Sequence, residues 1–379
     1  MHRLSSYALS AALHGYIAFR LIPALVQWPA LAALLALLLV VSAVAIPLGW
    51  TWRRRSPRFA TALTWSSYLA MGAFSSLFVL TLLRDVMLLA AAGLAALDPG
   101  AIDRGGVVAA SAVIVVALSA LMTLVGIWNA RRTARVRSIE IPISGLPDAL
   151  DGFTIAQISD VHVGPTIKGG YVRSIVERVN KLDADMVAIT GDLVDGSVGE
   201  LRPHVSPLAT LSSRHGTFFV TGNHEYYSGV HAWVRELRSL GVTVLLNEHV
   251  VLAHDDSVVV LAGVTDPSAH HFEPRHRSSP EQAIAGAPPD APVRVLLAHQ
   301  PRSAHAAADA GFDLQLSGHT HGGQFWPWNH FVRMQQPFVA GLDRLRDLWI
   351  YTSRGTGYWG PPIRFGAPSE ITQVRLVPA

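Results

Sequence analysis

Long apolar runs fill the first third of the chain, and shorter apolar runs recur through the remainder. Four of the long runs approach or exceed the roughly 20 residues that a helix needs to cross the hydrocarbon core of a bilayer. They cover residues 4–26, 30–50, 61–83 and 106–128. The pattern predicts an all-α transmembrane region of about four helices over residues 1–130. The third helix extends to about residue 97 if it continues past Arg84 and Asp85.

The apolar runs after residue 131 have the length of β-strands and alternate with helix-like stretches. The expected strands cover residues 138–144, 153–159, 186–190, 217–221, 257–263, 293–298, 314–317, 348–352 and 371–377. Helical stretches lie between them, at residues 172–182, 231–240 and 302–310. This alternation is typical of layered α/β proteins, so we expect an α/β domain over residues 131–379.

The start of the chain also allows a cleaved signal peptide, because residues 42–45 are small ones of the kind found at cleavage sites. The apolar region before them is too long for one signal sequence, and two more apolar runs follow. His14 and Arg20 lie in the first run, where ionisable groups are functional candidates by default. Both are near a span end, where a side chain reaches the interface, so we expect an anchor and not a transport path.

Basic clusters beside the apolar runs set the expected orientation. One lies between the second and third runs and the other follows the fourth: Arg53, Arg54, Arg55 and Arg58, then Arg131, Arg132, Arg135 and Arg137. Positive charge is retained on the cytoplasmic side of a membrane. We therefore expect a multi-pass protein of the inner or cell membrane whose α/β domain is cytoplasmic.

Overall charge changes this picture little. The formal net charge is +3, and only 15% of the residues are charged. No basic stripe is interleaved with aromatic residues, so the positive excess indicates a membrane surface, and we expect no nucleic-acid partner. The chain has no cysteine, so no disulfide can form.

Side chains that bind metals follow five of the expected strands. They are Asp160 and His162, then Asp192, then Asn223, His224 and Glu225, then His299, then His319 and His321. Strand ends meet along one edge of a parallel or mixed sheet, so residues scattered in sequence can converge there. Oxygen and nitrogen ligands without a thiolate suit Mn, Fe, Zn or Co. Buried unpaired Asp and His would be costly without a metal, which argues against a purely structural role.

These residues resemble the calcineurin-like metallophosphoesterase superfamily, whose blocks D-x-H, GD, GNH-(D/E), H and GH-x-H all occur here in order. The resemblance covers roughly residue 136 to the C-terminus and implies a four-layer αββα sandwich. It implies two divalent metal ions, the first held by Asp160, His162 and His321 and the second by Asn223, His299 and His319, with Asp192 bridging them. The metals would activate a water as hydroxide, and His224 would protonate the leaving oxygen, oriented by Glu225 or a nearby carboxylate.

Other polar residues are expected to be ordinary. Asp195 is expected to be a turn residue and not a ligand, and isolated histidines are expected on the surface or in the core. His270 and His271 lie in a polar loop from which they could reach a substrate. After His299 the chain departs from the family pattern with Gln300, which concerns the rim of the site and leaves substrate preference open.

The C-terminal segment resembles the branch of bacterial membrane-associated phosphodiesterases that carry an N-terminal transmembrane region. Some relatives in that branch cleave the pyrophosphate of lipid-linked sugar nucleotides. Arg354 and Arg364 are candidates to bind a second phosphate of the substrate, or else to form structural salt bridges. The aromatic residues at 325–328, 331 and 338 would form either a lipid-facing lip or a local core.

The sequence therefore predicts a membrane-anchored, dinuclear metal phosphohydrolase. Its expected substrate is a phosphorylated small molecule or lipid with a phosphodiester or pyrophosphate bond. The alternative is a non-catalytic membrane scaffold or sensor that binds a phosphorylated ligand through its metal site. An intact His224 argues against that alternative, because a binding protein needs no leaving-group acid. A transporter with a regulatory domain would need a polar path through the spans, and none is evident.

Overall fold

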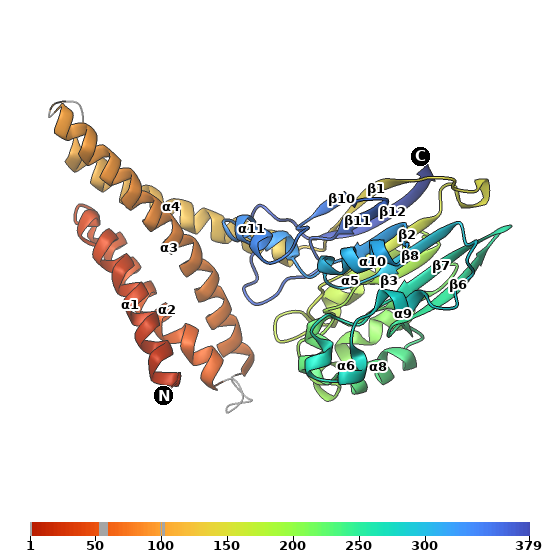
Figure 1. Cartoon of the computed structure of the whole chain (residues 1–379). Helices are drawn as coiled ribbons and strands as arrows, with labels where there is room; N and C mark the ends of the chain where they lie inside the picture. The colour runs from red at the N-terminus through yellow and green to blue at the C-terminus, as the bar shows by residue number, and fades with distance from the viewer. Residues whose placement is uncertain (1, 53–59, 99, 101–102) are drawn as a thin grey trace. The chain divides into compact units, whose positions relative to one another are not determined.

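The computed structural model describes residues 2–52, 60–98, 100 and 103–379 (Figure 1). The chain forms two compact units, one of Met1–Trp128 with Gly360–Phe365 and the other of Asn129–Trp359 with Gly366–Ala379. The first unit is helical and the second is α/β. A domain boundary at residues 130 and 131 stays a prediction.

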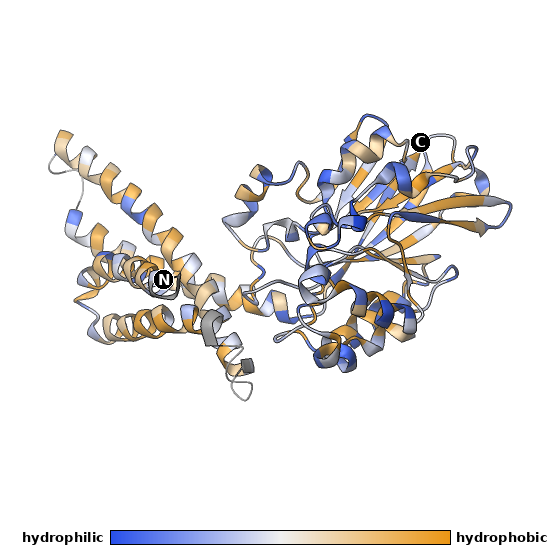
Figure 2. Ribbon diagram, turned by 60° about the horizontal axis from the view of Figure 1, so that its bottom comes forward, coloured by the Kyte–Doolittle hydropathy of each residue, from blue (hydrophilic) through white to orange (hydrophobic). Residues whose placement is uncertain are grey.

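Within the described residues, the helical unit contains four long helices, each apolar and long enough to cross a membrane. They are α1 (His2–Leu21), α2 (Pro29–Trp52), α3 (Ala60–Leu97) and α4 (Arg104–Arg131). Figure 2 shows hydrophobic residues around most of their circumference, as expected for helices surrounded by lipid. The predicted helical N-terminal region is therefore confirmed. The arginine cluster at 53–58 lies outside the described residues.

Helix α3 continues without a break through Arg84 and Asp85, because both side chains find partners on neighbouring helices. Asp85 accepts hydrogen bonds from Tyr16 Oη at 2.7 Å and from Arg20 Nε at 2.8 Å. Arg84 is buried and donates to the carbonyls of Arg20 and Val108, at 3.1 and 3.0 Å. Arg20 is thus paired inside its own unit, and these polar contacts join α1, α3 and α4.

His14 is also satisfied within the helical unit. It is buried, with Nδ1 2.7 Å from the carbonyl oxygen of Ser10 and Nε2 2.9 Å from Ser42 Oγ. Its ring stacks on Phe74 with the centroids 4.4 Å apart. These contacts are those of a packed core histidine that joins α1, α2 and α3.

The short segment Gly360–Phe365 belongs to the helical unit although it comes late in the sequence. Ile363 is buried and occupies the space that a Cβ would fill at Gly72 of α3 and at Gly126 of α4. The backbone N–H of Arg364 donates to the carbonyl of Gly126 at 2.9 Å. The two glycines therefore let the segment approach the helix backbones closely.

The α/β unit is built from two six-stranded mixed sheets. The first sheet has the order β1-β12-β2-β3-β4-β5 and the second β10-β11-β9-β8-β7-β6. The strands of the first sheet are β1 (Arg135–Ile143), β12 (Glu370–Pro378), β2 (Thr154–Ile158), β3 (Met186–Ile189), β4 (Thr217–Phe219) and β5 (Thr243–Val244). Those of the second are β10 (Gly341–Leu345), β11 (Leu348–Thr352), β9 (Leu314–Ser317), β8 (Val293–Leu297), β7 (Ser257–Gly263) and β6 (Glu248–His254).

Three hydrophobic clusters separate four layers in this unit, and these layers are the predicted αββα sandwich. The central cluster joins the two sheets, for example through Ile155 of β2 and Val295 of β8. A second cluster packs helices α5 (Gly169–Asn180), α6 (Val198–Val205) and α8 (Val230–Ser239) on the first sheet. The third packs α9 (Pro280–Ile284) and α10 (Ala304–Asp309) on the second sheet. The predicted fold class is therefore confirmed.

The close approach at Gly126 gives a test of the helical unit. We expect Gly126→Ala to displace Ile363 and lower the melting temperature of the detergent-solubilised full chain by about 2–6 °C, since overfilling a packed site costs about 1–3 kcal/mol. The control is Gly93→Ala in α3, where a Cβ meets no atom within 4 Å. That change should be neutral or stabilising because alanine favours the helix. Equal stability of the two variants would contradict the close approach.

Candidate metal centre

Parallel strands bring the predicted ligands together at one edge of the sandwich. β2, β3 and β4 are parallel in the first sheet, and β7, β8 and β9 are parallel in the second. The predicted ligands follow five of these strands, and the one after β4 opens helix α7 (Asn223–Ser228). They are Asp160 and His162 after β2, Asp192 after β3, Asn223 after β4, His299 after β8, and His319 and His321 after β9.

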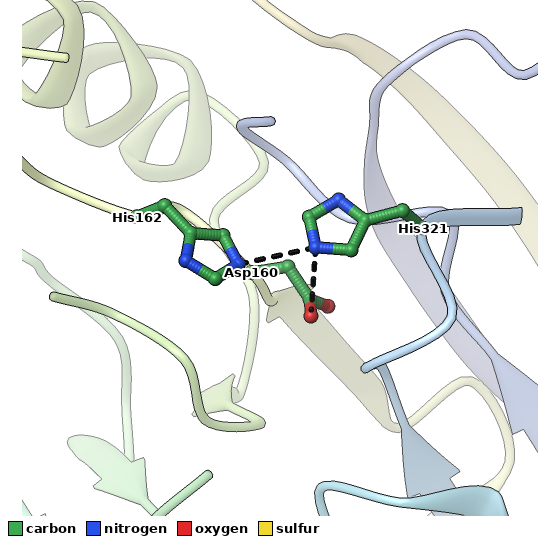
Figure 3. Close-up of side chains that lie close together, drawn as sticks. All are labelled: Asp160, His162 and His321. Carbon is green, nitrogen blue, oxygen red and sulfur yellow. Dashed lines mark hydrogen bonds and ion pairs between the residues drawn. The ribbon is translucent and has the colours of Figure 1, made fainter. Parts of the chain in front are cut away.

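Asp160, His162 and His321 form the first group (Figure 3). The Nε2 atoms of His162 and His321 lie 3.1 Å apart, and His321 Nε2 lies 3.5 Å from Asp160 Oδ1. One potential ligand atom from each residue lies within 4.8 Å of the others. Two imidazole nitrogens and one carboxylate oxygen at this spacing can hold one divalent cation.

Asp192, His299 and His319 form the second group. His299 Nε2 lies 3.1 Å from Asp192 Oδ2 and 3.2 Å from His319 Nδ1. Asp192 Oδ2 also lies 3.8 Å from His162 Nε2 in the first group. The Asp192 carboxylate is therefore within reach of both groups.

Asn223 carries a side-chain oxygen that is suited to metal binding, and its place in the second group stays a prediction. Its side-chain oxygen is buried and has no hydrogen-bond partner among the described residues. An orphaned buried amide oxygen costs free energy unless a ligand satisfies it. The donor set of carboxylate, amide and imidazole groups fits divalent cations, although it does not identify the metal.

The backbone is left-handed at five of the seven predicted ligands. The φ angles of these residues lie between 50° and 70°, and the residues are Asp160, His162, Asp192, His319 and His321. Residues other than glycine adopt this conformation rarely, and it costs of order 1–3 kcal/mol each where it is imposed. Such clusters of strain mark functional sites, because the surrounding sheets hold the turns that direct the side chains.

Two glycines permit the carboxylates to approach the backbone. A Cβ at Gly318 would overlap the side chains of Ser159 and Asp160, and a Cβ at Gly222 would overlap Asp192. The N–H of His319 donates to both oxygens of Asp160, at 2.9 and 3.0 Å. The N–H of His224 donates to Asp192 Oδ1 at 2.9 Å, which leaves Oδ2 toward the imidazoles.

A second set of hydrogen bonds orients the imidazoles. His299 Nδ1 donates to the carbonyl of Thr190 at 2.8 Å, so its Nε2 faces Asp192. His162 Nδ1 donates to Asp195 Oδ1 at 3.1 Å, so its Nε2 faces His321. Bonds of this kind fix the ring and its tautomer for metal binding.

Asp195 is the functional neighbour that the sequence did not indicate. Besides His162, it accepts a hydrogen bond from Nδ1 of His224 at 2.5 Å. Burial alone would raise the pKa of Asp195, but the charges and hydrogen bonds of the two histidines lower it well below its ordinary value. The carboxylate therefore stays ionised and links a predicted metal ligand to the predicted proton donor. The only sequence feature that could have indicated this role is its position three residues after Asp192.

Glu225 was one of the carboxylates expected to orient His224, but its contacts are with the backbone. Its carboxylate accepts the backbone N–H groups of Asp192, Leu193 and Gly222, at 3.0, 2.8 and 2.7 Å. It thus fixes the turn that carries Asp192. The nearby carboxylate that holds His224 is Asp195.

Electrostatics in the group match metal binding. Burial raises the pKa of Asp160, and the charge of Asp192 adds to this effect. Burial and the charge of His299 lower the pKa of His319 to about 3, which leaves the neutral imidazole that a metal requires. For His224, burial opposes protonation, but Asp195 and the charge of Asp192 outweigh it and raise the pKa to about 9. A divalent cation beside Asp192 would lower that value toward neutrality.

The groups that could hold a metal bring together six of the predicted ligands and His224, and neither Asn223 nor the two arginines belong to these groups of described residues. Arg354 Nη1 pairs with Glu370 Oε2 at 3.0 Å, and its side chain lies against Gly322 of the last metal-binding block. Arg364 is buried and belongs to the helical unit. The rings of His270 and His271 lie 3.9 Å apart in their loop, and substrate contact by any of these four residues stays a prediction.

A two-sheet sandwich with clustered Asp and His residues at its loop edge defines a metal-dependent class of phosphoesterases. The family model "Calcineurin-like phosphoesterase" matches residues 153–323. An uncharacterised metallophosphoesterase of Campylobacter jejuni is 35% identical over 264 residues, which cover 69% of this chain and 68% of that protein. The chain belongs to the calcineurin-like metallophosphoesterase family.

A transmembrane relative extends the similarity beyond the site. A "transmembrane protein with metallophosphoesterase domain" of Bos taurus is 40% identical over 289 residues, covering 73% of this chain. The chain spans a little under two thirds of that relative, 65% of its length. Among solved structures, a 5'-nucleotidase precursor of Thermus thermophilus is 13% identical with a TM-score of 0.39, over 59% of this chain and 54% of that one. Four apolar helices and the transmembrane relative indicate membrane association.

The position of Asp192 between the two groups predicts a loss of metal on its substitution. We expect Asp192→Asn, in the purified full chain loaded with Mn, to lower the metal-to-protein ratio to about half or less, because an amide is a weaker ligand than a carboxylate. Elemental analysis after removal of free metal measures the ratio. Asp256→Asn, at an exposed aspartate, is the control and should keep the full ratio. Equal metal content in both variants would remove Asp192 from the centre.

Proposed function

We propose that the chain is a membrane-anchored, dinuclear metal-dependent phosphohydrolase that cleaves a phosphodiester or pyrophosphate bond. The observation that carries this proposal is the position of Asp192 Oδ2, 3.1 Å from His299 of the second group and 3.8 Å from His162 of the first. A carboxylate in that position suits a bridge between two cations. In the proposed arrangement, Asp160, His162 and His321 hold one cation, and Asn223, His299 and His319 hold the other.

Two bound divalent cations would supply a water-derived nucleophile at neutral pH and neutralise charge on the phosphate. The chain's own residues supply the remaining chemistry. Asp195 fixes the ring of His224 through Nδ1, and His224 Nε2 lies 3.9 Å from Asp192 Oδ2. His224 Nε2 is therefore the proposed donor of a proton to the leaving oxygen.

The pair of Asp195 and His224 favours a catalyst over a binding scaffold. A protein that only senses a phosphorylated ligand does not need an imidazole oriented to deliver a proton to a leaving oxygen. Every ester leaving oxygen gains a proton, so this pair serves a diester and a monoester alike. We take the diester or pyrophosphate as the substrate because the C-terminal segment resembles the membrane-associated phosphodiesterases. We keep Arg354, which lies against Gly322, as the proposed contact for a second phosphate, whereas Arg364 is buried in the helical unit.

We also propose that the α/β unit lies on the cytoplasmic side and acts on a lipid-linked substrate. Arg131, Arg132, Arg135 and Arg137 follow the last apolar helix, which supports that orientation. Helix α11 (Trp328–Phe331) and the turn Val332–Met334 expose Trp328, Phe331 and Met334. Exposed apolar side chains at this spacing share one helical face and suit contact with lipid.

The activity test uses the full chain in detergent after Mn loading. We expect hydrolysis of methyl phenyl phosphate that exceeds hydrolysis of phenyl phosphate and disappears with chelator. His224→Ala and Asp195→Asn should each slow this diester by about 10²–10³-fold, since a positioned acid contributes about that much. The loss should be smaller on methyl 4-nitrophenyl phosphate, whose leaving group departs without a proton.

One variant serves as the control for this test, and two results would contradict parts of the proposal. Asp256→Asn should keep the wild-type rate on both diesters. Metal-bound wild-type protein that turns over no diester, pyrophosphate or monoester would contradict the proposed function and favour the scaffold. Equal losses of rate on both diesters would be consistent with a hydrolase but would contradict the role of His224 as the proton donor.

The lipid-facing lip gives a separate test. We expect combined Trp326→Ala and Trp328→Ala changes to reduce turnover of a long-chain alkyl phosphodiester in vesicles by about tenfold or more, because interfacial tryptophan is lost. Turnover of soluble methyl phenyl phosphate should change less than about twofold. Val251→Ala, at an exposed apolar residue of β6, is the matched control. Equal loss on the vesicle and soluble substrates would contradict the lip.

A further inference from the structure

The leaving group of the proposed reaction must extend over the surface next to His224. Asp195 occupies Nδ1 of His224, so only Nε2 is able to meet the leaving oxygen. In hydrolysis the bond from phosphorus to that oxygen breaks, a water oxygen bonds to phosphorus, and the leaving oxygen takes a proton from His224. Whatever the leaving oxygen carries therefore lies against the side chains around His224.

Three aromatic side chains from three separate segments form that surface, which we name the aromatic platform: Tyr227, Phe272 and Trp359. The ring centroids of Tyr227 and Trp359 lie 5.3 and 5.7 Å from that of His224, inclined by 70° and 73°. Phe272 lies 5.5 Å from Tyr227 at 65°. Each is about half exposed or more, at 61% for Tyr227, 52% for Phe272 and 50% for Trp359. Two of these exposed rings contact each other and two contact His224, and such an exposed apolar cluster beside the proposed proton donor is suited to ligand binding.

The platform is held in place by buried polar contacts. The amide of Gln324 binds the backbone of Trp359 twice, accepting from its N–H and donating to its carbonyl, both at 2.9 Å. Gln324 is buried and follows the metal-binding block that ends in His321 and two glycines. On the other side, the ring of Phe272 lies 5.9 Å from Tyr226, whose hydroxyl is 2.9 Å from Nδ1 of His276. A surface fixed in this way loses little conformational entropy when a ligand binds.

The chemistry of the platform favours an uncharged occupant. Glu273, next to Phe272, lies 3.4 Å from His231 and contributes a carboxylate to this side. The platform itself presents ring faces and ring edges, which bind flat π-systems by stacked or edge-to-face contact.

We propose that the aromatic platform binds the leaving group and selects one that bears an uncharged flat ring. The ring chemistry is shared by a nucleoside and an aryl-bearing alcohol. This inference rests on the proposed function and names the substrate class of that same site. The substrate is then a phosphodiester whose released alcohol carries a ring, while the other ester group faces away from His224.

The test measures which of two bonds is broken within one molecule. Benzyl methyl phosphate yields benzyl alcohol or methanol, and the ratio of these products does not depend on the amount of active protein. Cyclohexylmethyl methyl phosphate matches its size and apolarity without a flat ring, and the methyl ester of thymidine 5'-monophosphate tests the nucleoside source. We expect the wild-type full chain, loaded with Mn, to release the ring-bearing alcohol about tenfold more readily than the cyclohexylmethyl alcohol.

Variants of the platform should change the ratio and not only the rate. Trp359→Ala and Tyr227→Ala should each bring the benzyl ratio within about twofold of the cyclohexylmethyl ratio. Trp359→Phe should keep most of the preference because it keeps a ring. Gln324→Ala should weaken the preference without removing metal, and Val251→Ala should leave the ratio unchanged.

Each outcome decides the inference. Ratios unchanged in Trp359→Ala, Tyr227→Ala and Phe272→Ala would overturn it, as would equal release of benzyl and cyclohexylmethyl alcohols by the wild type. A larger benzyl than thymidine ratio would identify an aryl alcohol as the source, and the reverse would identify a nucleoside. Failure of the wild type to hydrolyse any diester would instead count against the proposed function, so the two failures are distinguishable.

Discussion

Burial of two aspartates at the edge where two sheets meet is the constraint that shapes the α/β unit. Asp160 and Asp192 are almost wholly buried, and a carboxylate without compensation is too costly to keep there. Backbone N–H groups of His319 and His224 satisfy one side of each carboxylate, and imidazoles face the other side. A divalent cation held by these residues would complete the compensation. The same residues therefore determine both the stability of this edge and its ability to bind metal.

The backbone around these aspartates follows from the same requirement. A strand that ended in an ordinary turn would send the next side chain away from the edge, whereas a left-handed residue turns it back. Five ligands adopt that conformation, at a cost that the sheets and the carboxylate of Glu225 must support. Glycine at positions 222 and 318 removes the side chain that would otherwise keep the neighbouring strand ends apart. The backbone at these residues departs from the conformation that they usually prefer, and the departure fixes the arrangement of the predicted ligands.

The sequence allowed prediction of features that repeat along the chain and of residues that follow the end of a helix or strand. The four apolar helices follow from the length of apolar runs, and the layered fold follows from strands alternating with helices. The residues that could hold a metal were indicated by the sequence because each block follows a strand, and their role as ligands stays a prediction. Asp195 was missed as a partner because a loop position carries no periodicity, and its contacts to residues 33 and 29 positions away depend on how β3 pairs with β2 and β4. Trp359 and Tyr227 meet at His224 for the same reason, since no sequence spacing relates the three segments.

The segment Gly360–Phe365 belongs to the helical unit, whereas the residues before and after it belong to the α/β unit. The chain therefore passes between the two units three times, after residues 128, 359 and 365. A protein with a removable anchor would be joined to it by one linker. Here a fragment that begins after α4 would leave Ile363 without Gly72 and Gly126, which exposes a side chain whose burial is worth about 2 kcal/mol. The helical unit therefore contains a segment from the C-terminal part of the chain, and limited proteolysis would have to cut three connections to separate the two units.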